Sequence, residues 1–151
     1  MPRAVLRLID ANANRALEGL RVCEEIIRFH AEVPALFRRL RALRHALAAA
    51  IRALPVGPVA LVRARDSRRD VGRRAPAASV SSLQHLALIN FQRAKESLRV
   101  LEECARLAHP THVVAFQRLR FRVYDAERAL LLRVEALRHR GSRRRRRSPA
   151  D

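Results

Sequence analysis

The stretch NRALEGLRV at residues 14–22 returns with few changes as QRAKESLRV at residues 92–100. Arg, Glu and Arg keep their offsets in both copies, and the apolar residues around the first copy have the spacing of an amphipathic helix. A second pair of segments also repeats, because FRRLR at residues 37–41 resembles FQRLR at residues 116–120. The sequence therefore predicts an all-α fold: a duplicated helical hairpin, packed as a four-helix bundle with approximate internal twofold symmetry.

Breaks in the helical pattern indicate where the four helices begin and end. We expect helices from Leu6 to Phe29, from residue 35 to about Leu54, from the capping sequence SSLQ at residues 81–84 to about Leu107, and from about His112 to Leu137. Residues 59–78 show no helical periodicity, and we interpret them as a long functional loop between the hairpins. Residues 1–138 then form one all-helical domain, and residues 139–151 form a disordered Arg-rich tail.

Composition restricts the class of protein. The chain has 151 residues, 49% of them apolar, which suits a single globular domain. It contains neither an apolar run long enough to span a membrane nor the apolar core of a signal peptide, so we expect a cytoplasmic protein with no membrane partner. Cys23 and Cys104 lie in helical patterns without metal-ligand spacing, and we interpret them as reduced core thiols.

The formal charge of +18 indicates anionic partners. The tail RHRGSRRRRRSPAD at residues 138–151 carries part of that charge and could bind polyanions. Aromatic residues make up only 4% of the chain and tryptophan is absent, so we expect no surface on which bases could stack. No nucleic-acid-binding motif is recognisable either, which makes nucleic acid the less favoured partner.

The duplicated helices carry polar residues on one side. Asp10, Asn14, Glu18, Arg21 and Glu25 share about a quarter of the first helix's circumference, and seven of the chain's 14 acidic residues lie in the duplicated segments. This clustering suggests a shared polar pocket, although each pair taken alone also has the spacing of an ordinary helix-surface ion pair. Gly19 and its counterpart Ser97 are both small, so either another helix or a flat ligand could approach the backbone there.

The loop RARDSRRDVGRR at residues 63–74 offers a second group of charged side chains. Arg65 could grip phosphate oxygens, and Asp66 and Asp70 could hold Mg²⁺, with Gly72 allowing a tight turn beside Asp70. A solvated charged loop without a ligand is the alternative. No P-loop, kinase-type glycine loop, HExxH or GxSxG motif occurs, and the six histidines lack metal-ligand spacing.

Four segments together resemble one known family: DANANRALEGLRVCEEIIRF, LRALRHAL, RARDSRRDVG and NFQRAKESLRVLEECARL. The chain resembles, from about residue 6 to residue 125, the small all-helical hydroxymethylpyrimidine phosphate kinases of thiamine biosynthesis. Members of that family occur alone or fused ahead of a thiamine-phosphate synthase. The resemblance implies transfer of the γ-phosphate of ATP, with Mg²⁺, to the phosphate of 4-amino-5-hydroxymethyl-2-methylpyrimidine phosphate, which gives the diphosphate.

Chemistry and the recurring motifs together assign roles to individual residues. The expected catalytic residues are Arg21, Asp70 and Arg99, and the expected metal ligands are Asp66 and Asp70. We expect Arg15, Arg21, Arg93 and Arg99 to converge on phosphate groups, and the repeat raises the question of whether Arg21 and Arg99 face each other across one pocket. The remaining binding residues are Arg65 as a phosphate clamp, Glu18 and Glu96 beside the arginines or the aminopyrimidine, and Asn12 and Asn90 for recognition of base or sugar.

Two other functions stay open. The chain has no room for the barrel of a fused synthase, so it could instead be a non-catalytic pyrimidine-phosphate-binding module that acts beside a separate synthase. A basic, nucleic-acid-associated helical protein that uses the Arg-rich tail is the second alternative. The sequence is also compatible with a homo-oligomer, and it does not decide whether the site lies within one chain or between subunits.

Overall fold

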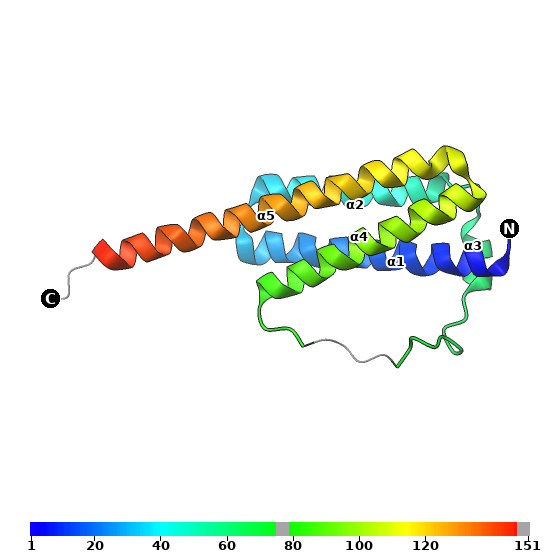
Figure 1. The fold of residues 1–151 in the computed structure, drawn as a ribbon, viewed down its shortest axis with the longest axis horizontal. Helices are drawn as coiled ribbons and strands as arrows, with labels where there is room; N and C mark the ends of the chain where they lie inside the picture. The colour runs from blue at the N-terminus through cyan, green and yellow to red at the C-terminus, as the bar shows by residue number, and fades with distance from the viewer. Residues whose placement is uncertain (75–78, 148–151) are drawn as a thin grey trace.

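The computed structural model describes residues 1–74 and 79–147, and the side chains of the last helix as far as residue 133. These residues form five α-helices, one π-helical turn and one 3-10 turn, with no strand among them, so the predicted all-α fold is confirmed. The order is α1 (Arg3–Ile26), η1 (Ile27–Ala31), α2 (Pro34–Ala53), α3 (Pro58–Ala64), α4 (Leu83–Ala108), η2 (Pro110–His112) and α5 (Val113–Arg147) (Figure 1).

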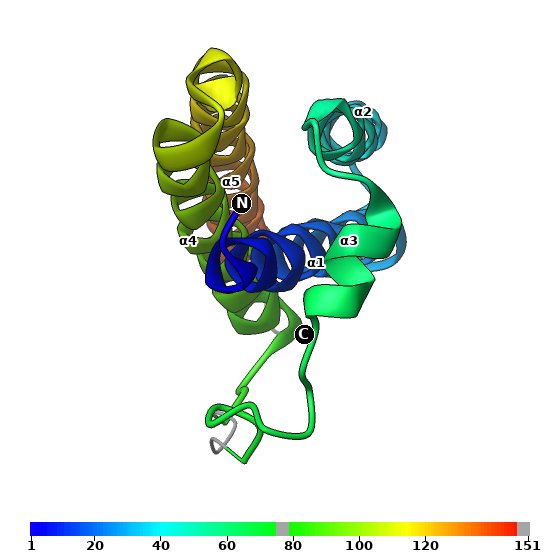
Figure 2. The same ribbon diagram turned by 90° about the vertical axis from the view of Figure 1, so that its right-hand side faces the viewer.

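The two sequence repeats form two helical hairpins, α1 with α2 and α4 with α5. Helices α1 and α4 run in opposite directions through the middle of the molecule, and the largest interface between helices lies between them (Figure 1). The end view in Figure 2 places α2 and α3 on one side of α1, and α4 and α5 on the other. Since α2 also contacts α5, the hairpins pack into the predicted bundle along the helices that carry the repeated segments.

The core lies between these helices and is almost entirely aliphatic. Its stripe on α1 and the first residue of η1 contains Ile9, Ala16, Leu20, Cys23 and Ile27, which repeat at the helical period predicted from the sequence. The other helices add Leu40, Leu43, Leu47, Phe91, Leu98, Leu101, Phe116 and Val123, all less than 2% exposed. Burial of one continuous core by both hairpins holds the two repeats together.

Gly19 lies at a close contact between α1 and α4. A Cβ atom added at this position would stand 2.8 Å from the carbonyl oxygen of Asn90 on α4, and 3.7 Å from the Cβ of Ala94. The glycine is therefore required by the helix crossing, one of the two explanations that the sequence left open.

Several predicted boundaries differ from the structure. Residues 58–64 form helix α3, which the sequence did not predict because its two turns are too short to show a period; Pro58 occupies its first turn, where proline is tolerated. The N-cap of α4 is Ser82, whose hydroxyl accepts a hydrogen bond of 3.0 Å from the His85 amide, and not the predicted Ser81. Helix α1 ends in a π-helical turn, followed by Glu32 in the left-handed conformation.

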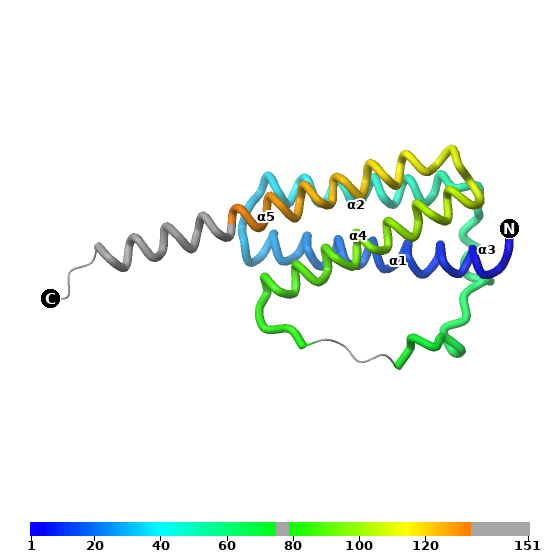
Figure 3. Tube along the Cα trace, in the orientation of Figure 1, coloured from blue at the N-terminus to red at the C-terminus, as the bar shows by residue number. Residues whose placement is uncertain are grey.

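The last helix continues to Arg147, beyond the predicted end at Leu137 (Figure 1). The first part of this helix lies beside α4 (Figure 3). Arginine is a good helix former, and no proline occurs between Pro110 and Pro149, so the helix meets no proline before Pro149. Residues 148–151 lie outside the described residues. That the segment 139–151 is a separate disordered tail stays a prediction.

Among the described helices, no single one is long and apolar enough to cross a membrane. Helices α2 and α3 meet the length and composition criteria only as a pair bent by 87°. The predicted cytoplasmic location stays a prediction.

Candidate functional site

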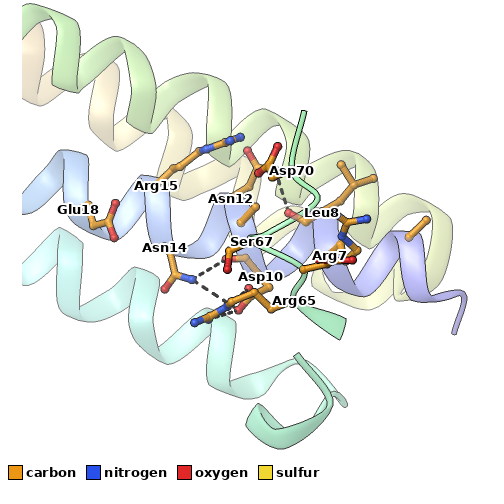
Figure 4. Close-up of a pocket in the computed structure, with 13 residues that line it drawn as sticks. Arg7, Leu8, Asp10, Asn12, Asn14, Arg15, Glu18, Arg65, Ser67 and Asp70 are labelled. Carbon is orange, nitrogen blue, oxygen red and sulfur yellow. Dashed lines mark hydrogen bonds and ion pairs between the residues drawn. The ribbon is translucent and has the colours of Figure 1, made fainter. Parts of the chain in front are cut away.

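A large cavity lies between the first half of α1 and the loop that follows α3 (Figure 4). Its volume is about 720 Å³. Helix α1 contributes Arg7, Asp10, Asn12, Asn14, Arg15 and Glu18 among its lining, and the loop contributes Arg65, Asp66, Ser67 and Asp70. The structure thus brings the predicted loop residues next to the first repeat.

Arg65 anchors this loop to α1. Its Nε and Nη2 atoms each donate a 2.7 Å hydrogen bond to the carboxylate of Asp10, which is only 7% exposed (Figure 4). These hydrogen bonds, followed by the charge of Asp10, raise the pKa of the Arg65 guanidinium. Because Asp10 occupies two of its donors, Arg65 holds the start of the loop in place. The sequence singled out both residues without indicating that they pair.

The carboxylates of Asp66 and Asp70 each stabilise a turn in the loop. Asp66 Oδ1 accepts a 3.2 Å hydrogen bond from the Arg69 amide, and Asp70 Oδ1 accepts a 2.8 Å hydrogen bond from the Gly72 amide. The second oxygen of Asp66 lies 4.0 Å from Arg3 Nη2, and that of Asp70 has no hydrogen-bond partner within the described residues. Both side chains line the cavity, so each can present an oxygen to a ligand there.

The described residues contain no group of three or more His, Cys, Asp or Glu side chains that could hold a metal ion. Mg²⁺ commonly binds through one or two carboxylates and the phosphates of a substrate. The two carboxylates of Asp66 and Asp70 suit this arrangement, in which the substrate phosphates would complete the coordination of the ion.

A second cavity, of about 630 Å³, lies between α1 and α4. Asn12, Arg15 and Glu18 line both cavities, so the two adjoin along α1. The other lining residues are Gly19, Asn90, Arg93, Glu96, Ser97 and Val100. Seven of the predicted binding residues therefore lie in two neighbouring cavities: Asn12, Arg15, Glu18, Arg65, Asn90, Arg93 and Glu96.

Three arginines in these cavities carry unpaired charge. In the described part of the chain, Arg7, Arg15 and Arg93 have neither an ion pair nor a side-chain hydrogen bond. Such guanidinium groups are free to bind an anion bidentately. Arg7 was not predicted, because the second repeat has no arginine at the corresponding position. Its spacing of two helical turns from Arg15 is the signal that could have found it.

Arg21 and Arg99 are each held by carboxylates of their own helix, and their catalytic role stays a prediction. Arg21 forms ion pairs with Glu24 and Glu25 of its own helix, and Arg99 forms ion pairs with Glu102 and Glu103 of its own helix. These acidic residues stand three and four positions further along, the spacing at which helix side chains meet. Arg21 lines neither cavity, and Arg99 lines a separate one together with Glu96, Lys95 and Tyr124.

The acidic partners of these two arginines join the helices of each hairpin. Glu24 on α1 is almost fully buried and accepts a 2.7 Å hydrogen bond from Arg44 Nε on α2. Glu102 on α4 is equally buried and accepts a 3.0 Å hydrogen bond from Arg120 Nε on α5. Arg21 and Arg99 therefore belong to the polar contacts within the hairpins.

Comparison with protein families decides what the chain is related to. A model of the ThiD2 family matches residues 7–129. The chain belongs to the ThiD2 family. All residues that line the two cavities lie inside the matched range except Ala4, whereas the Arg-rich tail lies outside it.

Curated relatives of this ThiD2 chain are named thiamine-phosphate synthase. That of Synechocystis sp. is 41% identical over 86% of the chain, that of Rhodopirellula baltica 37% over 89%, and that of Gloeobacter violaceus 38% over 83%. The chain spans a little over a third of their length, 36–37%. No solved structure matches it. The predicted membership in a family of thiamine biosynthesis is confirmed, and the kinase reaction stays a prediction.

Proposed function

We propose that this ThiD2 chain phosphorylates 4-amino-5-hydroxymethyl-2-methylpyrimidine phosphate with ATP, giving the diphosphate used in thiamine biosynthesis. The observation that carries the proposal is the pair of adjoining cavities: the unpaired Arg7 and Arg15 line one cavity together with the loop carboxylates Asp66 and Asp70, and the unpaired Arg93 lines the other. Free guanidinium groups bind phosphates, and carboxylates beside them suit a magnesium-bound nucleotide.

The reaction needs little from the protein beyond positioning and neutralisation of charge. An oxygen of the acceptor phosphate attacks the γ-phosphorus of ATP, and the bond from that phosphorus to the oxygen bridging the β- and γ-phosphates breaks. ADP leaves with the electron pair. Because a phosphate monoester is already ionised near neutral pH, no strong general base is required. Arg15 and Arg93 neutralise the two phosphates that approach each other.

Asp66 and Asp70 are the residues proposed to hold Mg²⁺ beside the phosphates of ATP. When bound, the ion neutralises phosphate charge. Arg65 keeps the loop that carries both aspartates against α1 through its contact with Asp10. It is therefore a positioning residue in this proposal, and not the phosphate clamp expected from the sequence.

The remaining polar residues recognise the organic part of the ligands. Glu18 has no hydrogen-bond partner in the described residues, so its carboxylate can accept a hydrogen bond from the exocyclic amine of an aminopyrimidine. Asn12 and Asn90 offer amide groups at the floor of the second cavity. Arg21 and Arg99 act as positioning residues in this scheme, since they pair with the carboxylates that join the hairpin helices.

An assay with two acceptors tests the proposal. The protein is given ATP and Mg²⁺ with either the pyrimidine phosphate or the free pyrimidine alcohol, and products are identified by mass. We expect diphosphate from the phosphate and no product from the alcohol. Asp70→Asn, which keeps the turn-forming oxygen, should slow product formation by about 100-fold or more. Absence of diphosphate with the wild-type protein would contradict the proposal.

The accessory-module alternative has its own support. The chain covers only a little over a third of relatives that are named for a synthase. A module that binds the pyrimidine phosphate without reacting would show saturable binding of that compound and no conversion when ATP and Mg²⁺ are added. The same assay, accompanied by a binding titration, separates the two functions.

A further inference from the structure

The cavity between α1 and α4 is built from equivalent residues of the two repeats. Four positions of the first copy recur in the second as side chains that line the same cavity. The pairs are Asn12 with Asn90, Arg15 with Arg93, Glu18 with Glu96, and Gly19 with Ser97. Helices α1 and α4 are antiparallel (Figure 1). The approximate twofold operation that exchanges the two repeats therefore exchanges the members of each pair, and its axis lies between them.

The floor of the cavity keeps this symmetry in its hydrogen bonds. Asn12 and Asn90 are each 6% exposed, and each donates through Nδ2 to the carbonyl four residues earlier. Both hydrogen bonds, to Leu8 and to Leu86, are 2.8 Å long. The contact of Gly19 with the Asn90 backbone fixes the separation of the helices at this point. Each repeat therefore contributes one half of the cavity, and these two half-sites have matching residues and hydrogen bonds.

The charges of the two half-sites also match. Arg15 and Arg93 both extend from exposed positions, and neither has an ion pair or hydrogen bond in the described residues. The other two arginines that we expected at phosphates, Arg21 and Arg99, are both paired within their helices. Of the four arginines that we expected at phosphates, only Arg15 and Arg93 thus remain available to bind one. They lie on either side of the axis.

From this arrangement we infer that the cavity binds a diphosphate group, with one phosphoryl unit on Arg15, the other on Arg93, and the bridging oxygen near the internal axis. A diphosphate has the same approximate twofold symmetry about its bridging oxygen, and each guanidinium can grip one phosphoryl unit bidentately. Glu18 and Glu96 line the same cavity and oppose a bare anion, so the diphosphate enters with a divalent cation or an amino-bearing ring.

The inference deepens the proposed function and rests on it for the organic part of the ligand. In the proposed reaction, the acceptor phosphate and the transferred phosphate become the two phosphoryl units of the product. Inorganic pyrophosphate, however, tests the diphosphate site without turnover. If the wild-type protein forms the diphosphate product but does not bind pyrophosphate, only this inference is wrong. If it binds pyrophosphate but forms no product, only the kinase proposal is wrong.

The test is calorimetric titration of the full chain with pyrophosphate and, separately, with orthophosphate, both with Mg²⁺ present. We expect one pyrophosphate per chain, bound about 10-fold or more tightly than orthophosphate, because two arginines share one ligand. Arg15→Ala and Arg93→Ala should each weaken pyrophosphate binding by about 10- to 100-fold, and by similar factors. Arg106→Ala is the matched control: it removes the same charge from α4, at a surface ion pair with Glu103, and should leave the Kd unchanged.

Three results would overturn the inference: pyrophosphate bound no more tightly than orthophosphate, wild-type affinity in both arginine variants, or dependence on one arginine alone. Arg15→Lys and Arg93→Lys guard against loss of folding, because they keep the charge while removing the bidentate geometry. Each lysine variant, shown to be folded by circular dichroism, should still weaken pyrophosphate binding. Wild-type affinity in both lysine variants would also overturn the inference that the two arginines grip the two phosphoryl units.

Discussion

At residue 19, the demands of packing outweigh those of helix propensity. Alanine in a helix is favoured over glycine by about 1 kcal/mol, but a Cβ at this position would stand 2.8 Å from the backbone oxygen of Asn90. Overpacking of this kind typically costs about 1–3 kcal/mol. The backbone of α4 has to move for the methyl group to fit. The glycine is therefore explained by a partner that lies far away in the sequence.

Because the added Cβ would meet a backbone oxygen, we expect a cost of overpacking in the upper part of that range, about 2–3 kcal/mol. Less the propensity gain of about 1 kcal/mol, Gly19→Ala should lower the free energy of unfolding by about 1–2 kcal/mol. Urea unfolding followed by circular dichroism measures this value. Gly57→Ala is the matched control, because an added Cβ there meets nothing within 4 Å; it should change stability by less than about 1 kcal/mol. Equal stability of Gly19→Ala and the wild type would show that the helices separate without cost.

Cys23 makes stability depend on pH in the alkaline range. Burial, followed by the charge of Glu127, raises the pKa of its thiol from the usual 9.0 to about 12. The unfolded chain ionises near the lower value and the folded chain near the higher one. The stabilisation is therefore fully present below pH 9 and is lost as the pH rises towards 12.

Between pH 8 and pH 10 the wild type should lose about 1 kcal/mol more unfolding free energy than Cys23→Ala, because only the wild type has this thiol to ionise on unfolding. Urea unfolding at the two pH values gives the difference. The folded wild type should also resist thiol reagents at pH 8 until urea unfolds it. Parallel pH profiles for the two proteins would show that Cys23 is ionisable in the folded state.

At the scale of helices, each hairpin is joined by a buried carboxylate held by an arginine on the next helix. In the first hairpin Glu24 meets Arg44, whereas in the second Glu102 meets Arg120. The repeats FRRLR and FQRLR align Arg120 with Arg41, so the two contacts are displaced by about one helical turn. The connections also differ, since a π-helical turn follows α1 and a 3-10 turn follows α4. The sequence repeat predicted both hairpins and could not predict this displacement.

Glu24→Gln should cost about 2–4 kcal/mol of unfolding free energy. Removing one partner of a buried ion pair typically costs about 3–5 kcal/mol, and Arg44 is partly exposed, which lowers the expected value. Glu103→Gln removes a carboxylate from the surface of α4 and should cost less than about 1 kcal/mol. Thermal or urea unfolding compares the two variants. If both variants lose similar, small amounts of unfolding free energy, the contact of Glu24 with Arg44 does not stabilise the packing of α1 on α2.

At the scale of the whole molecule, the duplication was the most reliable information in the sequence. It predicted the all-α fold, the two hairpins and the core stripe of α1, because helical periodicity reports directly on burial. It also indicated Arg15, Arg93, Asn12 and Asn90 as equivalent residues. Their meeting in one cavity depends on the antiparallel crossing of α1 and α4, which is a tertiary feature.

The parts that sequence reasoning missed have different physical causes. Helix α3 is too short to show a period, and the pairing of Arg65 with Asp10 joins residues from different elements. Arg21 and Arg99 were expected at the phosphates because they are repeated. Their pairing with carboxylates of their own helices, at ordinary helix spacing, removes them from the cavities.

The most direct test of the account measures diphosphate formation from ATP, Mg²⁺ and the pyrimidine phosphate by wild type, Arg15→Ala and Arg106→Ala, with products resolved by mass. The account predicts that wild type and Arg106→Ala form the diphosphate at similar rates, and that Arg15→Ala is slower by about 100-fold or more because a phosphate loses its guanidinium partner. No diphosphate from the wild type, or a wild-type rate from Arg15→Ala, would contradict it.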